Sequence, residues 1–136
     1  MTTGATFPRE LDALPGVFKL AEAFAAGNGL GERPRFLVDF VLEELFTNLV
    51  RHNPAATGAI DIELDLAGAE LMILVRDSDC ARFDLRTDAP VVDPNLPLAG
   101  RRPGGLGIYL VKSMVDRIEY GHQDRVGTIR LFKRLE

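Results

Sequence analysis

Three stretches of the chain place apolar residues at the three- and four-residue spacing of a helix. The first is residues 12–27, and Asn28-Gly29-Leu30-Gly31 predicts its end, because asparagine and glycine tolerate the left-handed conformation found there. A second helix is predicted from about Arg33 to His52, and a third from Leu106 to Val115. The apolar face of the first helix, which could form core or a dimer surface, comprises Leu14, Val17, Phe18, Ala21, Phe24 and Ala25.

Other stretches carry the pattern of strands. Residues 60–66 alternate apolar and acidic side chains, which predicts a strand with one buried and one solvent-facing side. A turn at residues 68–70 leads into the apolar run 71–75, and two more strands are predicted near residues 117–122 and 126–133. The order helix, helix, strand, strand, long loop, helix, strand, strand predicts a two-layer α+β sandwich with mostly antiparallel strands.

Composition narrows the class of protein. The chain has 136 residues, 46% hydrophobic and 26% charged, which predicts one folded domain spanning residues 1–136. Its formal net charge of −4 argues against direct nucleic-acid binding. Cys80 is the only cysteine, so no internal disulfide can form. With no apolar run of membrane-spanning length and no secretion signal in sight, we expect a cytoplasmic protein that does not bind membranes.

A basic, glycine-rich segment runs directly into the third predicted helix. Glycines allow a ligand to approach the backbone closely, and a helix start offers free N–H groups and a positive dipole end. The segment could therefore cradle an anion such as phosphate, or it could be a plain connection. The residues of this candidate cradle are Arg101, Arg102, Gly104, Gly105, Leu106 and Gly107.

Polar residues interrupt the second predicted helix at helical spacing. Glu44, Asn48 and His52 are four residues apart and fall on one face. The face could simply be solvated. Alternatively, the Asn48 amide oxygen could bind a hydrated Mg²⁺, and Glu44 could deprotonate an attacking hydroxyl or water.

Two further residues are candidates for reading a ligand. Asp77 ends the apolar strand, and its carboxylate could accept a hydrogen bond from an exocyclic amine such as that of adenine. It could equally start a turn by bonding its own backbone. Thr128 opens the last predicted strand, where its hydroxyl could help hold the same amine or simply decorate the strand.

Taken in chain order, these features resemble the GHKL, or Bergerat, ATP-binding fold. Within that superfamily the chain resembles the small anti-sigma factor serine kinases of bacterial partner-switching systems. Residues 43–52 are similar to their N box, residues 102–111 to their glycine box, and residues 131–135 to their last strand. The resemblance covers roughly residues 8–135. It implies a two-layer sandwich with a mixed, mostly antiparallel sheet and helices on one face.

The resemblance also implies roles for single residues. Glu44 would be the catalytic base, and Asn48 would hold the Mg²⁺ that bridges the ATP phosphates. Asp77 would accept the adenine amine, with Thr128 assisting. The lid over the phosphates would be formed by Gly104, Gly105, Leu106 and Gly107, and Arg101 or Arg102 would reach the terminal phosphate.

The partners implied by the resemblance are proteins. The chain would phosphorylate a serine of a small anti-sigma-factor antagonist, sequester a sigma factor or analogous target, and form a homodimer. One position departs from the family pattern: a glycine normally stands two residues after the adenine-reading aspartate, and here it is Asp79. Its bulk and negative charge should weaken nucleotide binding. Two hypotheses follow, an ATP-dependent serine kinase and a binding module on the same fold that acts by capturing partners.

Overall fold

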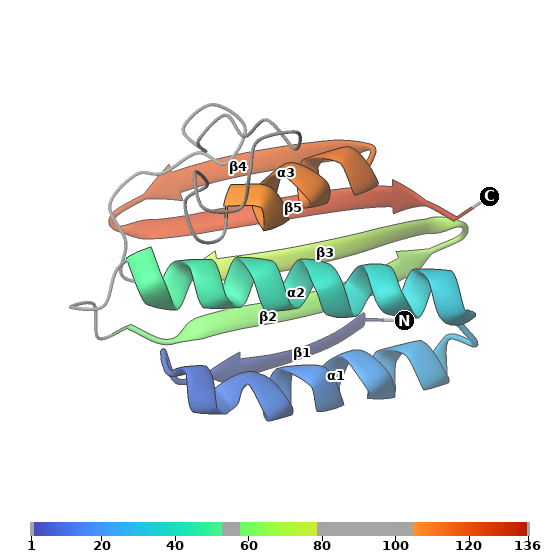
Figure 1. Cartoon of the computed structure of the whole chain (residues 1–136), viewed down its shortest axis with the longest axis horizontal. Helices are drawn as coiled ribbons and strands as arrows, with labels where there is room; N and C mark the ends of the chain where they lie inside the picture. The colour runs from blue at the N-terminus through green and yellow to red at the C-terminus, as the bar shows by residue number, and fades with distance from the viewer. Residues whose placement is uncertain (1, 53–57, 79–104, 136) are drawn as a thin grey trace.

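A sheet with all the described α-helices on one face forms the protein (Figure 1). The computed structural model describes residues 2–52, 58–78 and 105–135. In chain order, its elements are β1 (Thr2–Phe7), a 3₁₀ turn η1 (Leu11–Ala13), α1 (Leu14–Gly27), α2 (Glu32–His52), β2 (Ile60–Ala67), β3 (Glu70–Asp77), α3 (Gly105–Met114), β4 (Arg117–Gln123) and β5 (Val126–Arg134).

The five described strands lie in the order β1-β2-β3-β5-β4, and each neighbouring pair is antiparallel. The helices cover this sheet side by side, with α2 between α1 and α3 (Figure 1). The predicted two-layer α+β architecture is therefore confirmed, except that the described sheet is purely antiparallel where a mixed, mostly antiparallel one was expected. None of the helices in the described part of the chain is long and apolar enough to cross a membrane.

The helix boundaries follow the local sequence signals. Residues 14–27 form α1, and Gly29 beyond its end has a φ of +64°, a conformation that glycine adopts without strain. The Asn28 side-chain amide donates to the Phe24 carbonyl at 2.8 Å, and the Leu30 N–H donates to the Ala25 carbonyl at 3.0 Å. These bonds satisfy carbonyls that the end of α1 leaves without helical partners, so the predicted end of the helix is confirmed.

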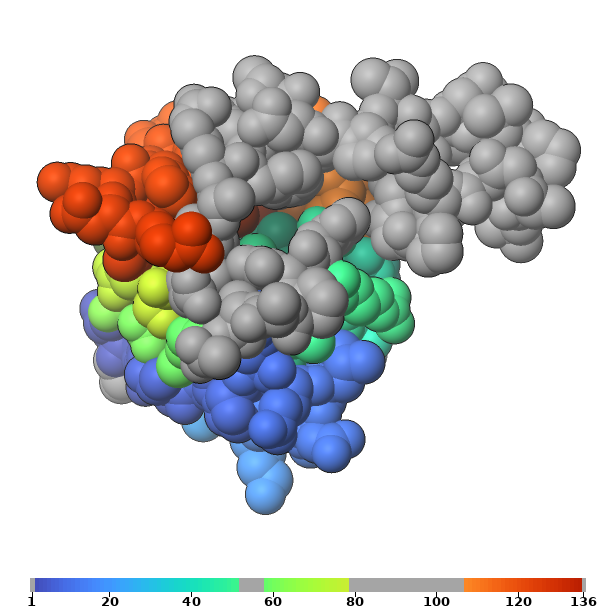
Figure 2. All heavy atoms as spheres, turned by 90° about the vertical axis from the view of Figure 1, so that its left-hand side faces the viewer, coloured from blue at the N-terminus to red at the C-terminus, as the bar shows by residue number. Residues whose placement is uncertain are grey.

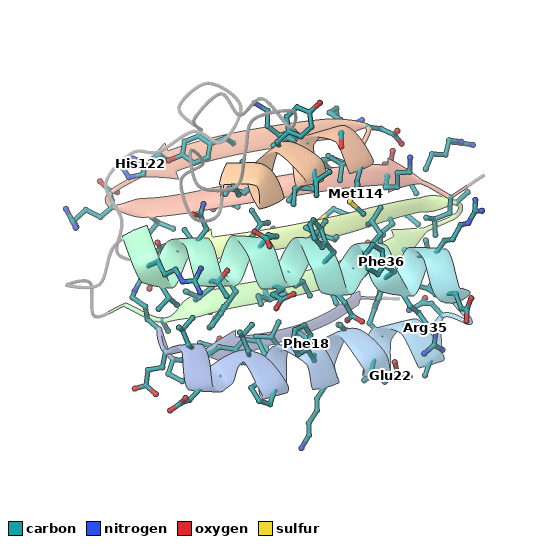
Figure 3. The ribbon with its side chains drawn as sticks, viewed as in Figure 1. Phe18, Glu22, Arg35, Phe36, Met114 and His122 are labelled. Atoms are coloured by element: carbon teal, nitrogen blue, oxygen red, sulfur yellow. The ribbon has the colours of Figure 1, made fainter. Side chains whose placement is uncertain are left out.

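The core lies between the helices and the covered face of the sheet. Strands β2 and β3 turn alternate residues into it, so the predicted period-two pattern of β2 is confirmed. On α1, Val17 is fully buried in this core, whereas Phe18 is only half-buried (Figure 3). Fully burying one aliphatic or aromatic side chain contributes about 1.5–3 kcal/mol. The largest such side chains include Phe24, Leu42, Phe46, Ile60, Ile62, Leu64, Leu71, Ile73 and Leu131.

The first strand, β1, was not predicted from the sequence. It pairs with β2 from Thr2 opposite Asp65 to Phe7 opposite Ile60. Only Phe7 anchors it to the core, with its ring meeting the Phe46 ring edge-to-face at a centroid distance of 6.4 Å. The strand carries the chain to the end of the sheet where β3 finishes and α2 and α3 present their candidate residues.

Candidate functional site

Glu44 and Asn48 lie one turn apart on α2, and both side chains are half-buried. α2 packs against α3, and the carboxyl group of Glu44 lies directly against Gly107 in the first turn of α3. A Cβ built on Gly107 would overlap this carboxyl group, with Oε1 only 2.7 Å away. The structure therefore brings together one predicted residue of the N box and one of the glycine box.

The surroundings of Glu44 favour its protonated form. Burial raises the pKa of the Glu44 carboxyl group above its ordinary value, and the negative charge of Glu43 raises it further, while Arg51 lowers it. A carboxylate with a raised pKa is a stronger base, so it takes a proton from a hydroxyl group more readily. The electrostatics of Glu44 suit a general base better than a solvated surface residue.

Asp77 ends β3 with its side chain almost completely buried. Its carboxylate accepts hydrogen bonds from both terminal nitrogens of Arg9, with Nη1 3.2 Å from Oδ2 and Nη2 bonded to Oδ1. The side chains of Arg9 and Asp77 are only 4% and 3% exposed. Two further hydrogen bonds hold the Arg9 side chain in place. It donates to the carbonyl oxygens of Gly58 at 3.1 Å and Leu49 at 3.4 Å.

The strand register decides what can share a ligand with Asp77. Asp77 lies opposite Gly127 on β5, and Thr128 lies opposite Arg76. Residues alternate between the two faces of a strand, and Ile129 in β5 belongs to the core, so Gly127 faces the helices and Thr128 faces away from them. The expectation that Thr128 assists Asp77 is wrong in this register, because the two side chains point to opposite faces of the sheet.

Four positions of the predicted site fall outside the described residues. They are Arg101, Arg102 and Gly104 of the glycine-rich segment, and Asp79, which departs from the family pattern. The backbone of Gly105 and Leu106 begins α3, so the predicted helix start is confirmed. The N–H groups of a first helical turn have no partners within the helix, and they can bind an anion.

Asn48 is the predicted Mg²⁺ ligand in the described part of the chain. Within residues 2–52, 58–78 and 105–135, no group of three or more His, Cys, Asp or Glu residues gathers where it could hold a metal. An octahedral Mg²⁺ held by one side chain, waters and substrate phosphates needs no such cluster. Asn48, half-buried on the same side of α2 as Glu44, fits that kind of binding.

Arg9 is the residue that sequence analysis missed. It follows β1 in Pro8-Arg9-Glu10, a segment that reads as a solvated connection. Its partner Asp77 is 68 positions away, so no local periodicity could pair them. Figure 2 looks onto this end of the sheet, where the blue N-terminal segment lies beneath the green and yellow strand residues.

A shallow groove of about 460 Å³ lies elsewhere, near the start of α2 and the end of α3. Phe36 and Met114 line it, and Figure 3 shows both between the two helices. Phe36 is 62% exposed and stacks on Phe40 at a centroid distance of 5.9 Å. None of the predicted site residues lines this groove.

Comparisons with known proteins agree with the fold described above. The family model for the histidine kinase-like ATPase domain matches residues 7–133. A similar solved structure is that of the RsbU and RsbW domains of Rv1364c from Mycobacterium tuberculosis, with a TM-score of 0.69 and 17% sequence identity. The match covers 99% of the present chain and 32% of the solved one, so the chain spans about a third of the length of that solved chain. No curated protein matches the chain.

Proposed function

Because the chain belongs to the histidine kinase-like ATPase family, we propose that it binds Mg²⁺-ATP and phosphorylates a serine of a partner protein. The observation that carries the proposal is the position of Glu44. Its half-buried carboxyl group lies against Gly107 at the N-terminal turn of α3, with Asn48 one turn further along α2. A base, a metal ligand and an anion-binding helix start thus come from two neighbouring elements.

In the proposed reaction, the serine oxygen attacks the terminal phosphorus of ATP. The bond between that phosphorus and the bridging oxygen breaks, ADP leaves with the bond's electron pair, and Glu44 takes the serine proton. Positioning and charge neutralisation supply most of the catalysis in phosphoryl transfer. The role of Glu44 is therefore to orient the hydroxyl group and to accept its proton.

The remaining residues would hold the nucleotide. The Asn48 oxygen would bind the Mg²⁺ ion, which neutralises phosphate charge when bound. The glycine box would surround the phosphates, with Arg101 or Arg102 reaching the terminal one. Asp77 would accept a hydrogen bond from the adenine amine. This requires Arg9 to release the Asp77 carboxylate.

The proposed partners are those of a partner-switching system. The chain would phosphorylate a small anti-sigma-factor antagonist and hold a sigma factor or analogous target, acting as a homodimer in the cytoplasm. The structural similarity to a chain with RsbU and RsbW domains supports this proposal through the fold. The net charge of −4 supports protein partners over nucleic acid.

A second candidate function is partner capture without phosphoryl transfer. The ion pair between Arg9 and Asp77 favours partner capture, because a buried carboxylate that is already paired with a guanidinium group is not open to the adenine ring. In that case the fold would serve as a binding module with weak or no affinity for nucleotide.

The test is phosphoryl transfer to a candidate anti-sigma-factor antagonist from the same organism. Incubation with Mg²⁺ and ATP labelled on its terminal phosphate should label a serine of that antagonist. Glu44→Gln should abolish the label but retain ATP binding. Glu43→Gln, which changes the exposed neighbouring carboxyl group, is the matched control and should keep the label. Unlabelled antagonist in a stable complex with the chain would favour partner capture.

A further inference from the structure

The carboxylate expected to read adenine is occupied by a residue of the same chain. Asp77 and Arg9 meet through two hydrogen bonds between the carboxylate and the guanidinium group, which is the strongest common geometry for this pair. With both side chains at least 96% withdrawn from solvent, little water competes for the contact. Asp77 is therefore satisfied before any ligand arrives.

The contact uses the same chemistry as base recognition. A carboxylate reads an exocyclic amine by accepting its N–H, and here the guanidinium N–H groups take that place. At 3% exposure, the Asp77 side chain offers no open surface to an amine while Arg9 stays. Arg9 is not loosely placed, because the carbonyl groups of Leu49 and Gly58 also hold it.

We propose that Arg9 sets the nucleotide affinity and base selectivity of this domain by competing with the adenine amine for Asp77. This inference rests on the proposed function, in which Asp77 is the adenine reader. When only a fraction of the protein molecules is in the state that can bind a ligand, the affinity for that ligand is reduced by the same fraction. Arg9 lies in the connection between β1 and η1, so binding of adenine would release a side chain that this connection supplies.

Removing the guanidinium group should reveal the competition. Arg9→Met keeps the length of the side chain and removes its donors. Because one charge-assisted hydrogen bond contributes about ten- to hundredfold in an equilibrium, Mg²⁺-ATP should bind the variant tighter by about that factor. Mg²⁺-ITP, whose base has an oxygen in place of the amine, should gain little. Arg35→Met is the control, because Arg35 pairs with Glu22 at 2.6 Å between α1 and α2 and lies outside the site (Figure 3).

Calorimetry separates the outcomes. The proposal is supported if Arg9→Met binds ATP tighter than the unmodified chain does, while its ITP affinity and the ATP affinity of Arg35→Met are unchanged. This holds also if the unmodified chain binds no ATP at all. If the unmodified chain binds ATP and Arg9→Met binds it no tighter, the competition is refuted and the proposed function stands. If neither binds ATP, both the competition and the proposed function fail.

Arg9→Met removes the guanidinium charge that faces Asp77, so a second experiment covers the case in which this variant fails to fold. Arg9→Lys keeps a cation but lacks the planar fork, and it should give a smaller gain in ATP affinity. In the unmodified chain, NMR of the arginine Nε–H groups follows Arg9 directly during titration with Mg²⁺-ATP. A shift of the Arg9 signal toward that of an exposed arginine supports displacement, and an unchanged signal at saturation refutes it.

Discussion

The carboxyl group of Glu44 on α2 rests against Gly107 on α3, so close that a Cβ on the glycine would overlap it. A glycine before or within the first turn of such a helix is usually explained by the approach of phosphate. Here Gly107 has a second reason to lack a side chain, because the candidate base fills the space where a Cβ would lie. The contact ties the position of the base to the position of the anion-binding helix start.

We therefore expect Gly107→Ala to damage the site through Glu44. The added methyl group must displace the carboxyl group or shift α3, and overpacking of this kind costs about 1–3 kcal/mol of stability. Urea unfolding measures that cost, and phosphoryl transfer should fall in the same variant. Gly121→Ala in β4 is the control, because a Cβ there meets nothing within 4 Å. Equal stability of the two variants would show that Glu44 moves aside freely.

The raised pKa of Glu44 predicts that Glu44→Gln increases the stability of the fold by an amount that depends on pH. The folded protein holds the Glu44 proton more tightly than the unfolded chain, since burial and Glu43 raise its pKa. Stability therefore falls as the pH rises from about 4.3, the ordinary glutamate value, through the raised value in the folded state. Above that window, the unmodified chain carries a partly buried charge that the glutamine variant lacks.

Thermal unfolding between pH 4 and pH 8 checks this sign. Glu44→Gln should be more stable than the unmodified chain at neutral pH, and the difference should shrink toward acid. Glu43→Gln, at the exposed position one residue away, removes only the repulsion between the two carboxylates and should show a smaller trend of the same sign. If the stability of Glu44→Gln relative to the unmodified chain is lower at pH 8 than at pH 4, the raised pKa of Glu44 is contradicted.

Much of the fold followed from periodicity, whereas β1 and Arg9 did not. Residues 60–66 alternate strictly and became β2, but Thr2–Phe7 has one apolar anchor and owes its strand form to pairing with β2. Arg9 depends on a partner brought near only by the folded sheet. For Thr128, in contrast, a signal was present, because the apolar residues at 129 and 131 already assign it to the opposite face.

The buried ion pair predicts a large loss of stability from Asp77→Asn. This change keeps the shape of the side chain but removes the Asp77 charge that faces the buried Arg9 guanidinium group. Breaking a buried pair from one side costs about 3–5 kcal/mol. Glu22→Gln breaks the exposed pair with Arg35 and should cost about 1 kcal/mol or less. Chemical unfolding of both variants checks the contrast, and similar losses would mean that solvent screens the Arg9–Asp77 pair.

The last prediction is that the Mg²⁺ dependence of nucleotide binding rests on Asn48. Its amide is half-buried one turn from Glu44, and a neutral oxygen ligand suits a Mg²⁺ ion that keeps most of its waters. In Asn48→Ala, we expect ATP affinity to become insensitive to Mg²⁺ and to match that of the unmodified chain in a chelator. Asn48→Asp, which retains an oxygen at the same reach, should restore part of the dependence. Calorimetric titrations with and without Mg²⁺ measure both effects, and an unchanged Mg²⁺ dependence in Asn48→Ala would assign the ion to other ligands.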